Sequence, residues 1–235
     1  MTNPKSAHVV GAVIFDLFGT LVEDFATGVS PTDRDLPSIL NAPRESFQQL
    51  WRQTARLRID GTFQSVEASI AHVCDTIGVK PTGEQIGEAA KFRLEQIRRA
   101  LKPKPDAAPT LAQLKGAGYK LGLLSNCSIE IPTLWPKISL APFFETAVFS
   151  SRDRLCKPDP RIFQLACERL GVAPDSCVYV ADGENRELAA AAKLGMHAIL
   201  IRNPSAQKRP DLFREAAEWQ GDSVSTLSEV VRIVR

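Results

Sequence analysis

Four short segments of the sequence place reactive side chains directly after an apolar run or directly before a helical pattern. They supply carboxylates, hydroxyls and an ammonium group, which proteins use for nucleophilic attack, anion binding and magnesium ligation. The four segments are Phe15-Asp16-Leu17-Phe18-Gly19-Thr20-Leu21, Leu124-Ser125-Asn126, Lys157-Pro158-Asp159-Pro160 and Val180-Ala181-Asp182-Gly183-Glu184-Asn185-Arg186-Glu187. If these segments meet in the fold, the sequence predicts an active site there.

The carboxylate of Asp16, just past the first apolar run, is of a type that can act as a nucleophile. A carboxylate is weakly nucleophilic in water, but one held in line with phosphorus or carbon gains from proximity and divides one difficult step into two. Asp16, Asp182 and Glu187 would place three negative charges in one pocket, and Lys157 can offset only one of them. Two like charges about 4 Å apart repel by roughly 4 kcal/mol at an effective dielectric near 20. A bound divalent cation removes this excess, and all-oxygen ligation suits Mg²⁺.

The apolar runs beside these segments indicate the fold. Runs rich in β-branched residues recur at residues 9–15, 121–124, 147–149, 177–181 and 198–201. They are continuous instead of alternating with polar residues, as strands buried on both faces of a parallel sheet require. Helical patterns alternate with the later runs, which predicts a doubly wound, Rossmann-like α/β core. Ligands of such sheets bind beyond the carboxyl ends of the strands.

About a hundred residues between the first two runs contain helical patterns and no convincing strand. Apolar residues at three- and four-residue spacing form three stripes there. The stripes are Phe47, Leu50, Trp51, Thr54 and Leu57, then Val66, Ile70, Val73 and Ile77, then Ile86, Ala90, Leu94 and Ile97. We therefore expect residues 25–100 to form a helical domain inserted into an α/β core made of residues 1–24 and 101–235. Residues 203–221 are rich in charge and turn formers, and residues 227–234 are predicted to form a short closing helix.

The composition indicates a compact globular protein and gives no sign of nucleic-acid binding. A chain of 235 residues with 44% hydrophobic residues can fill the core of one α/β domain and a smaller insertion. Its 29 basic and 27 acidic residues are mixed along the chain, without the basic stripe that binds nucleic acid. Five cysteines without a C-x-x-C pair predict reduced thiols, and the first apolar run is too short for a signal peptide or membrane span. We therefore expect a cytoplasmic protein without nucleic-acid or membrane partners.

With all four segments in order and a helical insertion after the first, the chain resembles the haloacid dehalogenase superfamily, a group of mostly phosphate-cleaving hydrolases. The resemblance covers residues 9–22 and about 105–202. It implies a nucleophile at Asp16 and a set of residues that bind the transferred group and neutralise its charge, namely Thr20, Ser125, Asn126 and Lys157.

The resemblance also implies a magnesium site and a mobile cover. The metal ligands would be Asp16, Asp182, Glu187 and the backbone carbonyl of Phe18. Glu187 stands where the family usually has an aspartate. The inserted helices correspond to the cap that closes the site in one branch of the family.

Phe18 departs from the pattern of the family's phosphomonoesterases, which have a second aspartate there as general acid and base. Phenylalanine cannot move a proton. The 2-haloacid dehalogenase branch has a tyrosine at this position and needs no acid, because halide leaves without a proton. Those dehalogenases also have a cap segment similar to Trp51-Arg52-Gln53, whose arginine binds the substrate carboxylate. Arg52 is therefore a candidate substrate contact.

Asp182 favours the phosphatase branch, because the dehalogenases have uncharged residues there and use no metal. Without Mg²⁺, Asp182 would repel both Asp16 and an incoming carboxylate. The favoured function is magnesium-dependent hydrolysis of a small phosphorylated metabolite through an aspartyl-phosphate. Two alternatives stay open: metal-independent dehalogenation of a 2-haloacid through an aspartyl ester, and ligand binding by a relative with little or no activity.

Overall fold

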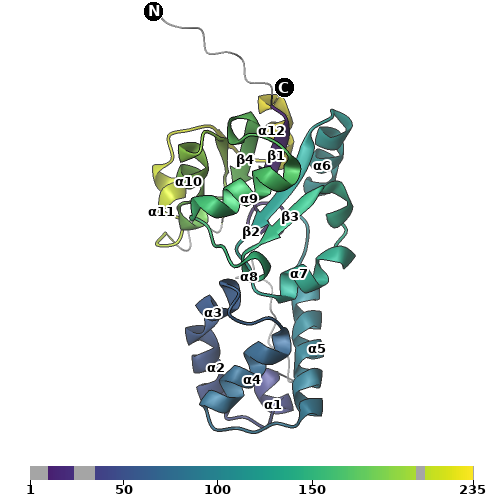
Figure 1. Cartoon of the computed structure of the whole chain (residues 1–235), viewed down its shortest axis with the longest axis vertical. Helices are drawn as coiled ribbons and strands as arrows, with labels where there is room; N and C mark the ends of the chain where they lie inside the picture. Colours follow the sequence, from purple (N-terminus) through teal and green to yellow (C-terminus); the bar gives the residue numbers. More distant parts are fainter. Residues whose placement is uncertain (1–9, 24–34, 205–209, 235) are drawn as a thin grey trace, which may run out of the picture.

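The structure is a computed structural model, which describes residues 10–23, 35–204 and 210–234 (Figure 1). These residues form a six-stranded parallel sheet in the order β3-β2-β1-β4-β5-β6. The strands are β1 (Ala12–Phe15), β2 (Lys120–Ser125), β3 (Thr146–Phe149), β4 (Cys177–Ala181), β5 (His197–Ile201) and β6 (Ser223–Val224). The predicted doubly wound α/β class is confirmed. The direction in which strands are added reverses between β1 and β4, which is where such sheets bind ligands.

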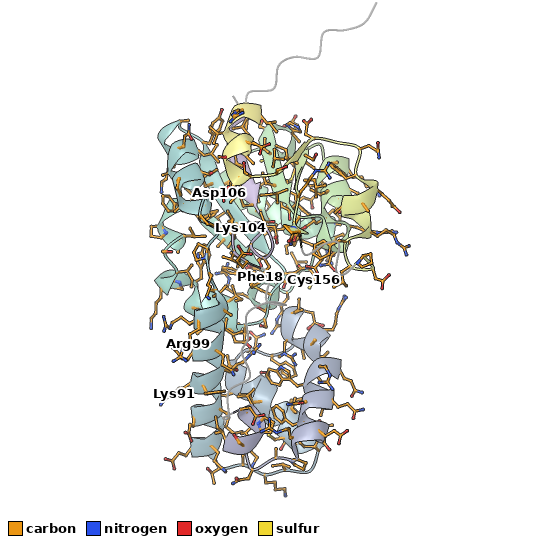
Figure 2. The ribbon with its side chains drawn as sticks, turned by 180° about the vertical axis from the view of Figure 1, so that it is seen from behind. Phe18, Lys91, Arg99, Lys104, Asp106 and Cys156 are labelled. Atoms are coloured by element: carbon orange, nitrogen blue, oxygen red, sulfur yellow. The ribbon has the colours of Figure 1, made fainter. Side chains whose placement is uncertain are left out.

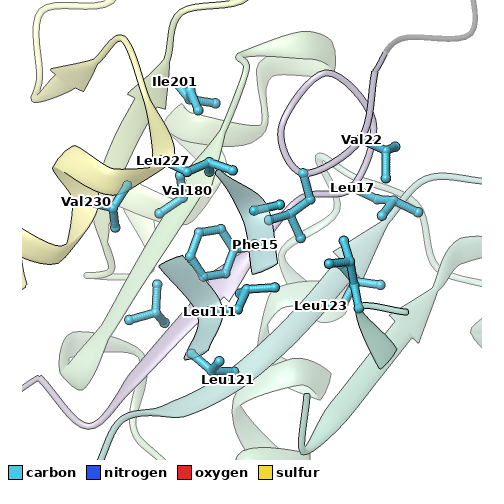
Figure 3. Close-up of a cluster of buried hydrophobic side chains, with 14 of the residues drawn as sticks. Phe15, Leu17, Val22, Leu111, Leu121, Leu123, Val180, Ile201, Leu227 and Val230 are labelled. Atoms are coloured by element: carbon cyan, nitrogen blue, oxygen red, sulfur yellow. The ribbon is translucent and has the colours of Figure 1, made fainter. Parts of the chain in front are cut away.

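The central strand β1 is buried on both faces, as its continuous apolar sequence requires. Its side chains point alternately into two hydrophobic clusters. Val13 and Phe15 belong to the cluster shown in Figure 3, which also contains Leu123 of β2 and Val180 of β4. The neighbouring side chains of β1 pack in the cluster on the opposite face of the sheet. Burial on both sides therefore holds the end of β1, where Asp16 follows, in a rigid setting.

Helices cover both faces of the sheet (Figure 1). Apolar side chains of α6 and α12 pack in the cluster with Phe15, while those of α9 and α10 pack on the opposite face. The described helices that follow residue 100 are α6 (Ala107–Gly116), α7 (Glu130–Leu134), α8 (Ser150–Asp153), α9 (Pro160–Leu170), α10 (Glu187–Lys193), α11 (Arg214–Glu218) and α12 (Leu227–Ile233). Short 3₁₀ turns are η2 (Trp135–Lys137), η3 (Ala141–Phe143), η4 (Pro174–Ser176) and η5 (Glu184–Arg186).

Residues 35–100, between β1 and α6, are mainly helical and lie together at one end of the molecule, below the sheet in Figure 1. Its helices are α1 (Leu36–Ile39), α2 (Arg44–Gln53), α3 (Ala55–Ile59), α4 (Val66–Thr76) and α5 (Gly83–Ala100). They share a hydrophobic cluster of their own that includes Phe47, Ile70 and Val73. The helical segment, residues 35–100, meets the α/β unit where α5 contacts α7 and α3 contacts α8.

The stripe from Phe47 to Leu57 forms two helices and not one continuous helix. Thr54 separates α2 from α3, with backbone angles φ −87° and ψ 9°. Its hydroxyl donates to the Leu50 carbonyl at 2.8 Å, a local bond that bends helices. The change of direction matters for the site, because it determines which side of α3 faces the α/β unit.

Other differences from the sequence prediction concern short elements. The first strand begins at Ala12, later than predicted, and Val9 lies outside the described residues. The two-residue strand β6 and the short helices α1 and α11 have too few residues to show a periodic pattern. The predicted domain boundary at residues 24–25 also lies outside the described residues. Within the described ranges, no helix has the length and apolar character needed to cross a lipid bilayer.

Candidate active site

The carboxyl ends of three adjacent strands bring the predicted reactive residues together. Asp16 directly follows β1, Asn126 follows β2 and Asp182 follows β4, and β1 lies between the other two strands. The backbone N–H of Asp16 donates to the Val180 carbonyl at 2.9 Å, which continues the β1–β4 pairing. Parallel strands end at the same edge of a sheet, so side chains from distant parts of the chain meet there.

Lys157 forms the centre of a buried polar network. Its ammonium group donates to Asp16 Oδ1 at 2.6 Å and to Glu187 Oε2 at 2.5 Å. A third contact joins Lys157 Nζ to the Tyr179 hydroxyl at 3.3 Å, and that hydroxyl donates to Glu187 Oε2 at 2.7 Å. Burial disfavours the charged lysine, but Asp16 and Glu187 outweigh it and raise the pKa of Lys157 above its usual value. Lys157 is therefore positively charged at neutral pH and in direct contact with Asp16.

Asn126 fixes the position of Lys157 through two backbone bonds. The Asn126 side chain donates from Nδ2 to the Lys157 carbonyl at 3.1 Å and accepts the Lys157 N–H on Oδ1 at 2.8 Å. The amide of Asn126 thus clamps the loop that precedes α9 to the end of β2. Asp159 caps α9 by accepting from the Arg161 N–H, and Pro160 occupies the first turn, where its missing N–H costs nothing.

Asp182 lies beside the loop that follows Asp16. Its Oδ2 accepts a 2.8 Å hydrogen bond from Asn203 Nδ2. Gly19 has φ +71°, and a Cβ at this position would lie 1.9 Å from Asp182 Oδ2, so another residue would clash as well as strain the backbone. The Gly19 carbonyl accepts a hydrogen bond from Lys104. Burial, followed by the charges of Asp16 and Glu187, raises the pKa of Asp182 well above its usual value.

These residues surround a cavity of about 320 Å³ between the sheet edge and the helical segment. Figure 2 shows Phe18 and Cys156 at this junction. The residues that line the cavity are Asp16, Phe18, Arg56, Ile59, Asn126, Cys156, Lys157, Asp182, Glu184, Asn185 and Glu187. Six of them were identified from the sequence as site candidates. Arg56 in the cavity wall was not, because its position depends on the helix break at Thr54. Tyr179 of the buried network was also missed, because its hydroxyl lies within an apolar strand.

Arg52, the predicted substrate contact, is not in the wall of this cavity. It is exposed on α2 and lines a separate groove beside Asp35, Phe47 and Gln96. Arg56, one helical turn later and beyond the break, lines the cavity instead. The physical reason is the bend at Thr54, which turns α3 toward the α/β unit and leaves Arg52 on the outer side.

Thr20 and Ser125 are fully buried and do not line the cavity. Within the described residues, Thr20 Oγ1 has no hydrogen-bond partner, and Ser125 Oγ has none besides the neighbouring Cys127 thiol. A buried hydroxyl without a good partner costs about 1–3 kcal/mol. Neither hydroxyl reaches the cavity in this structure, so their predicted role in binding the transferred group stays a prediction.

Three carboxylates are close enough to share a metal ion. Asp16, Asp182 and Glu187 are all buried, and each offers an oxygen within 4.8 Å of the others. Burial raises the pKa of Glu187 to about 7, with Lys157 opposing this and Asp16 adding to it. One oxygen of Glu187 binds Lys157 and Tyr179, while Oε1 is buried without a hydrogen-bond partner among the described residues. All-oxygen donors with surplus negative charge fit Mg²⁺.

Comparison with known proteins identifies the family of the chain. A sequence profile of the haloacid dehalogenase-like hydrolases matches residues 10–195. The chain is 31% identical over 195 residues to (S)-2-haloacid dehalogenase 4A of Burkholderia cepacia, covering 81% of this chain and 82% of that protein. It is 32% identical over 158 residues to glyceraldehyde 3-phosphate phosphatase of Methanopyrus kandleri, covering 66% and 68%.

A solved structure shares the fold. The 2-haloacid dehalogenase of Pseudomonas syringae pv. Tomato DC3000 matches with a TM-score of 0.71 at 22% identity, over 96% of this chain and 98% of that one. The chain therefore belongs to the haloacid dehalogenase-like hydrolases, and it is an enzyme. Its relatives include both dehalogenases and phosphatases.

Proposed function

We propose that this enzyme is a magnesium-dependent phosphohydrolase that acts on a small phosphorylated metabolite. The observation that supports the proposal is the buried meeting of Asp16, Asp182 and Glu187. When all three are ionised, their combined charge exceeds that of Lys157, the ammonium group that contacts two of them. Metal-independent chemistry on an anionic substrate would have to bring a further negative charge into this pocket, at a cost of a few kcal/mol.

In the proposed reaction, a carboxylate oxygen of Asp16 attacks phosphorus. An O–P bond to Asp16 forms as the bond to the leaving oxygen breaks, and water then hydrolyses the aspartyl-phosphate to release phosphate. Lys157 holds Asp16 in position and offsets charge on the phosphoryl oxygens. The buried hydroxyls of Thr20 and Ser125 are the candidate donors to those oxygens. An Mg²⁺ ion held by Asp16, Asp182, Glu187 and the Phe18 carbonyl would neutralise charge on the phosphoryl group.

The helical segment is proposed to act as the cap that completes the cavity. Arg56 and Ile59 of α3 line the cavity opposite the nucleophile. No ion pair of Arg56 is found among the described residues. We therefore place the substrate contact at Arg56, which would bind a second anionic group of the metabolite, such as a carboxylate or another phosphate.

Phe18 supports dehalogenation as a second candidate function. Its aromatic side chain supplies no general acid, which an alkyl phosphate ester requires and a halide does not. The 31% identity to a haloacid dehalogenase spans more of this chain than the 32% identity to a phosphatase. In this reaction Asp16 would displace halide from carbon and form an ester, and Arg56 would bind the substrate carboxylate.

A substrate panel with and without Mg²⁺ distinguishes the candidates. We expect phosphate release from acyl or aryl phosphates that depends on Mg²⁺ and is lost in chelator. Halide release from (S)-2-haloacids in the presence of chelator would instead establish dehalogenation. A ligand that raises the melting temperature without any turnover would indicate a binding protein and contradict both hydrolytic proposals.

A further inference from the structure

A buried ion pair joins the helical segment to the α/β unit away from the nucleophile. Glu130 begins α7 and is 1% exposed. Its Oε1 accepts a 2.9 Å hydrogen bond from Nε of Arg93, which lies on the long helix α5. Burial disfavours the charge on Glu130, but Arg93 and the hydroxyl of Ser128 outweigh it and lower the pKa of Glu130. Glu130 is therefore an anion on the α/β side of the junction.

A second arginine, Arg58 of α3, belongs to the same cluster. Its guanidinium is buried, stacks 4.0 Å above the centroid of the Trp51 ring and donates to the Thr54 hydroxyl at 3.0 Å. The Arg93 guanidinium lies 5.5 Å from the same ring. Burial lowers the pKa of Arg58 to about 10, while the charge of Glu130 acts in the opposite direction. The Trp51 ring thus joins Arg58 of α3 to Arg93 of α5, whose guanidinium is paired with Glu130.

We propose that Glu130 is a positioning residue that sets the place of α3 over the nucleophile. Helix α3 has five residues, too few to be stable without tertiary contacts, so its position depends on what it packs against. Arg58 on this helix stacks on the Trp51 ring, which the Glu130 partner Arg93 also approaches. Arg56 and Ile59 on the same helix line the cavity. Removing one partner of a buried ion pair leaves an uncompensated buried charge. The energetic cost of that charge falls when the helices separate and water reaches it.

The position of α3 has a reporter that does not depend on activity. Cys156 Sγ lies 3.8 Å from the Ile59 carbonyl of α3, at the wall of the cavity. Cys156 is half-buried, whereas the other four cysteines are buried. Separation of α3 from the α/β unit would therefore expose Cys156 first, and its alkylation by iodoacetamide, mapped by mass spectrometry, measures that separation.

The test compares Glu130→Gln with a control variant on α5, the helix that carries Arg93. Glu95→Gln removes an anion of α5 that pairs with Arg98 and Arg99. Both pairs are exposed to solvent, so their loss should change stability little. We expect Glu130→Gln to speed alkylation of Cys156 roughly tenfold or more, since a hydrogen bond to a charged group is lost. In Glu95→Gln, Cys156 should be alkylated at the wild-type rate. Arg93→Gln should reproduce the effect, and the double variant should add little to either single change.

The kinetic arm rests on the proposed function, whereas the alkylation arm does not. For a substrate with a second anionic group, Glu130→Gln should raise KM roughly tenfold with little change in kcat, because the contact from α3 is weakened. The proposal is overturned if folded Glu130→Gln and Arg93→Gln both alkylate Cys156 at the wild-type rate. It is also overturned if the buried cysteines react as fast as Cys156, because that reports general unfolding. If Glu130→Gln does not fold, Arg93→Gln decides the same question.

Discussion

Asp16 is the residue on which the proposed chemistry depends. Its side chain is 8% exposed and paired with Lys157, so a neutral replacement of the same size can keep the local packing. We expect Asp16→Asn to fold normally and to lose activity by at least roughly 10³-fold, because the amide is not a nucleophile. Circular dichroism and steady-state kinetics test this together. Activity within tenfold of wild type would remove Asp16 from the role of nucleophile.

Asp182 separates the metal-dependent proposal from the metal-independent one. In Asp182→Asn a hard anionic ligand is lost, so Mg²⁺ affinity and phosphatase activity should fall together, each by roughly tenfold or more. Calorimetric titration with Mg²⁺ and an activity titration with the same ion measure the two quantities. An unchanged Mg²⁺ titration would contradict the proposed ligand set and favour the dehalogenase alternative.

Phe18 determines which leaving groups the enzyme can release. A positioned general acid contributes about 10²- to 10⁴-fold, and phenylalanine supplies none of it. We expect acyl and aryl phosphates, which leave as stabilised anions, to be hydrolysed much faster than alkyl phosphates. When formation of the aspartyl-phosphate limits the rate, the measured rate should fall steeply as the pKa of the leaving group rises.

The matched variants for this prediction are Phe18→Asp and Phe18→Leu. The new carboxylate should partly restore alkyl phosphate cleavage, while leucine, which removes the ring without adding an acid, should not. Efficient hydrolysis of simple sugar phosphates by the wild type would show that another group supplies the proton. Glu23 is a nearby candidate, and Asp24 lies outside the described residues.

At the scale of elements, the break between α2 and α3 decides which arginine faces the substrate. Arg56 lines the cavity and Arg52 does not, although both are exposed cations on neighbouring helices. We expect Arg56→Gln to raise KM for substrates with a second anionic group by roughly tenfold or more, with a smaller effect on kcat. Arg52→Gln is the control and should leave KM unchanged. The reverse result would show that the helical segment binds substrate in another arrangement.

At the scale of the whole molecule, the junction between the helical segment and the α/β unit should respond to acid. Glu130 has a folded-state pKa below its ordinary value of 4.5, so its ionised form stabilises the folded protein. That contribution is present above the ordinary pKa and is lost as the pH falls through the lower, folded pKa. Breaking a buried pair costs about 3 kcal/mol or more.

We therefore expect wild type to exceed Glu130→Gln in free energy of unfolding at neutral pH. The difference should shrink progressively as the pH falls below about 4.5 toward pH 3. Urea denaturation of both proteins over this range measures it. A difference that stays constant with pH would mean that the glutamine variant is destabilised by altered packing and not by loss of charge.

Much of the fold follows from local sequence. The apolar runs ending at Asp16 and Asp182 are continuous because both faces of β1 and β4 are buried, and this burial pattern is visible in the order of residues. Strand ends then indicate where reactive residues gather, so the parallel sheet and the nearness of Asp16 and Asp182 could be predicted. The helices α4 and α5 were predicted for the same reason, because each buries one apolar stripe.

The remaining features depend on contacts between residues far apart in the chain. Lys157 and Asp16 are 141 positions apart, and only packing of α9 on the sheet brings them within 2.6 Å. Tyr179 has the pattern of a core residue until its hydroxyl meets Glu187 and Lys157. Arg56 and Arg52 look equivalent in sequence, and the bend at Thr54 separates them. Sequence alone determined the class of chemistry, because residue type and strand end are local properties. Tertiary structure decided which charges face the substrate, because the direction of a side chain depends on everything packed around its helix.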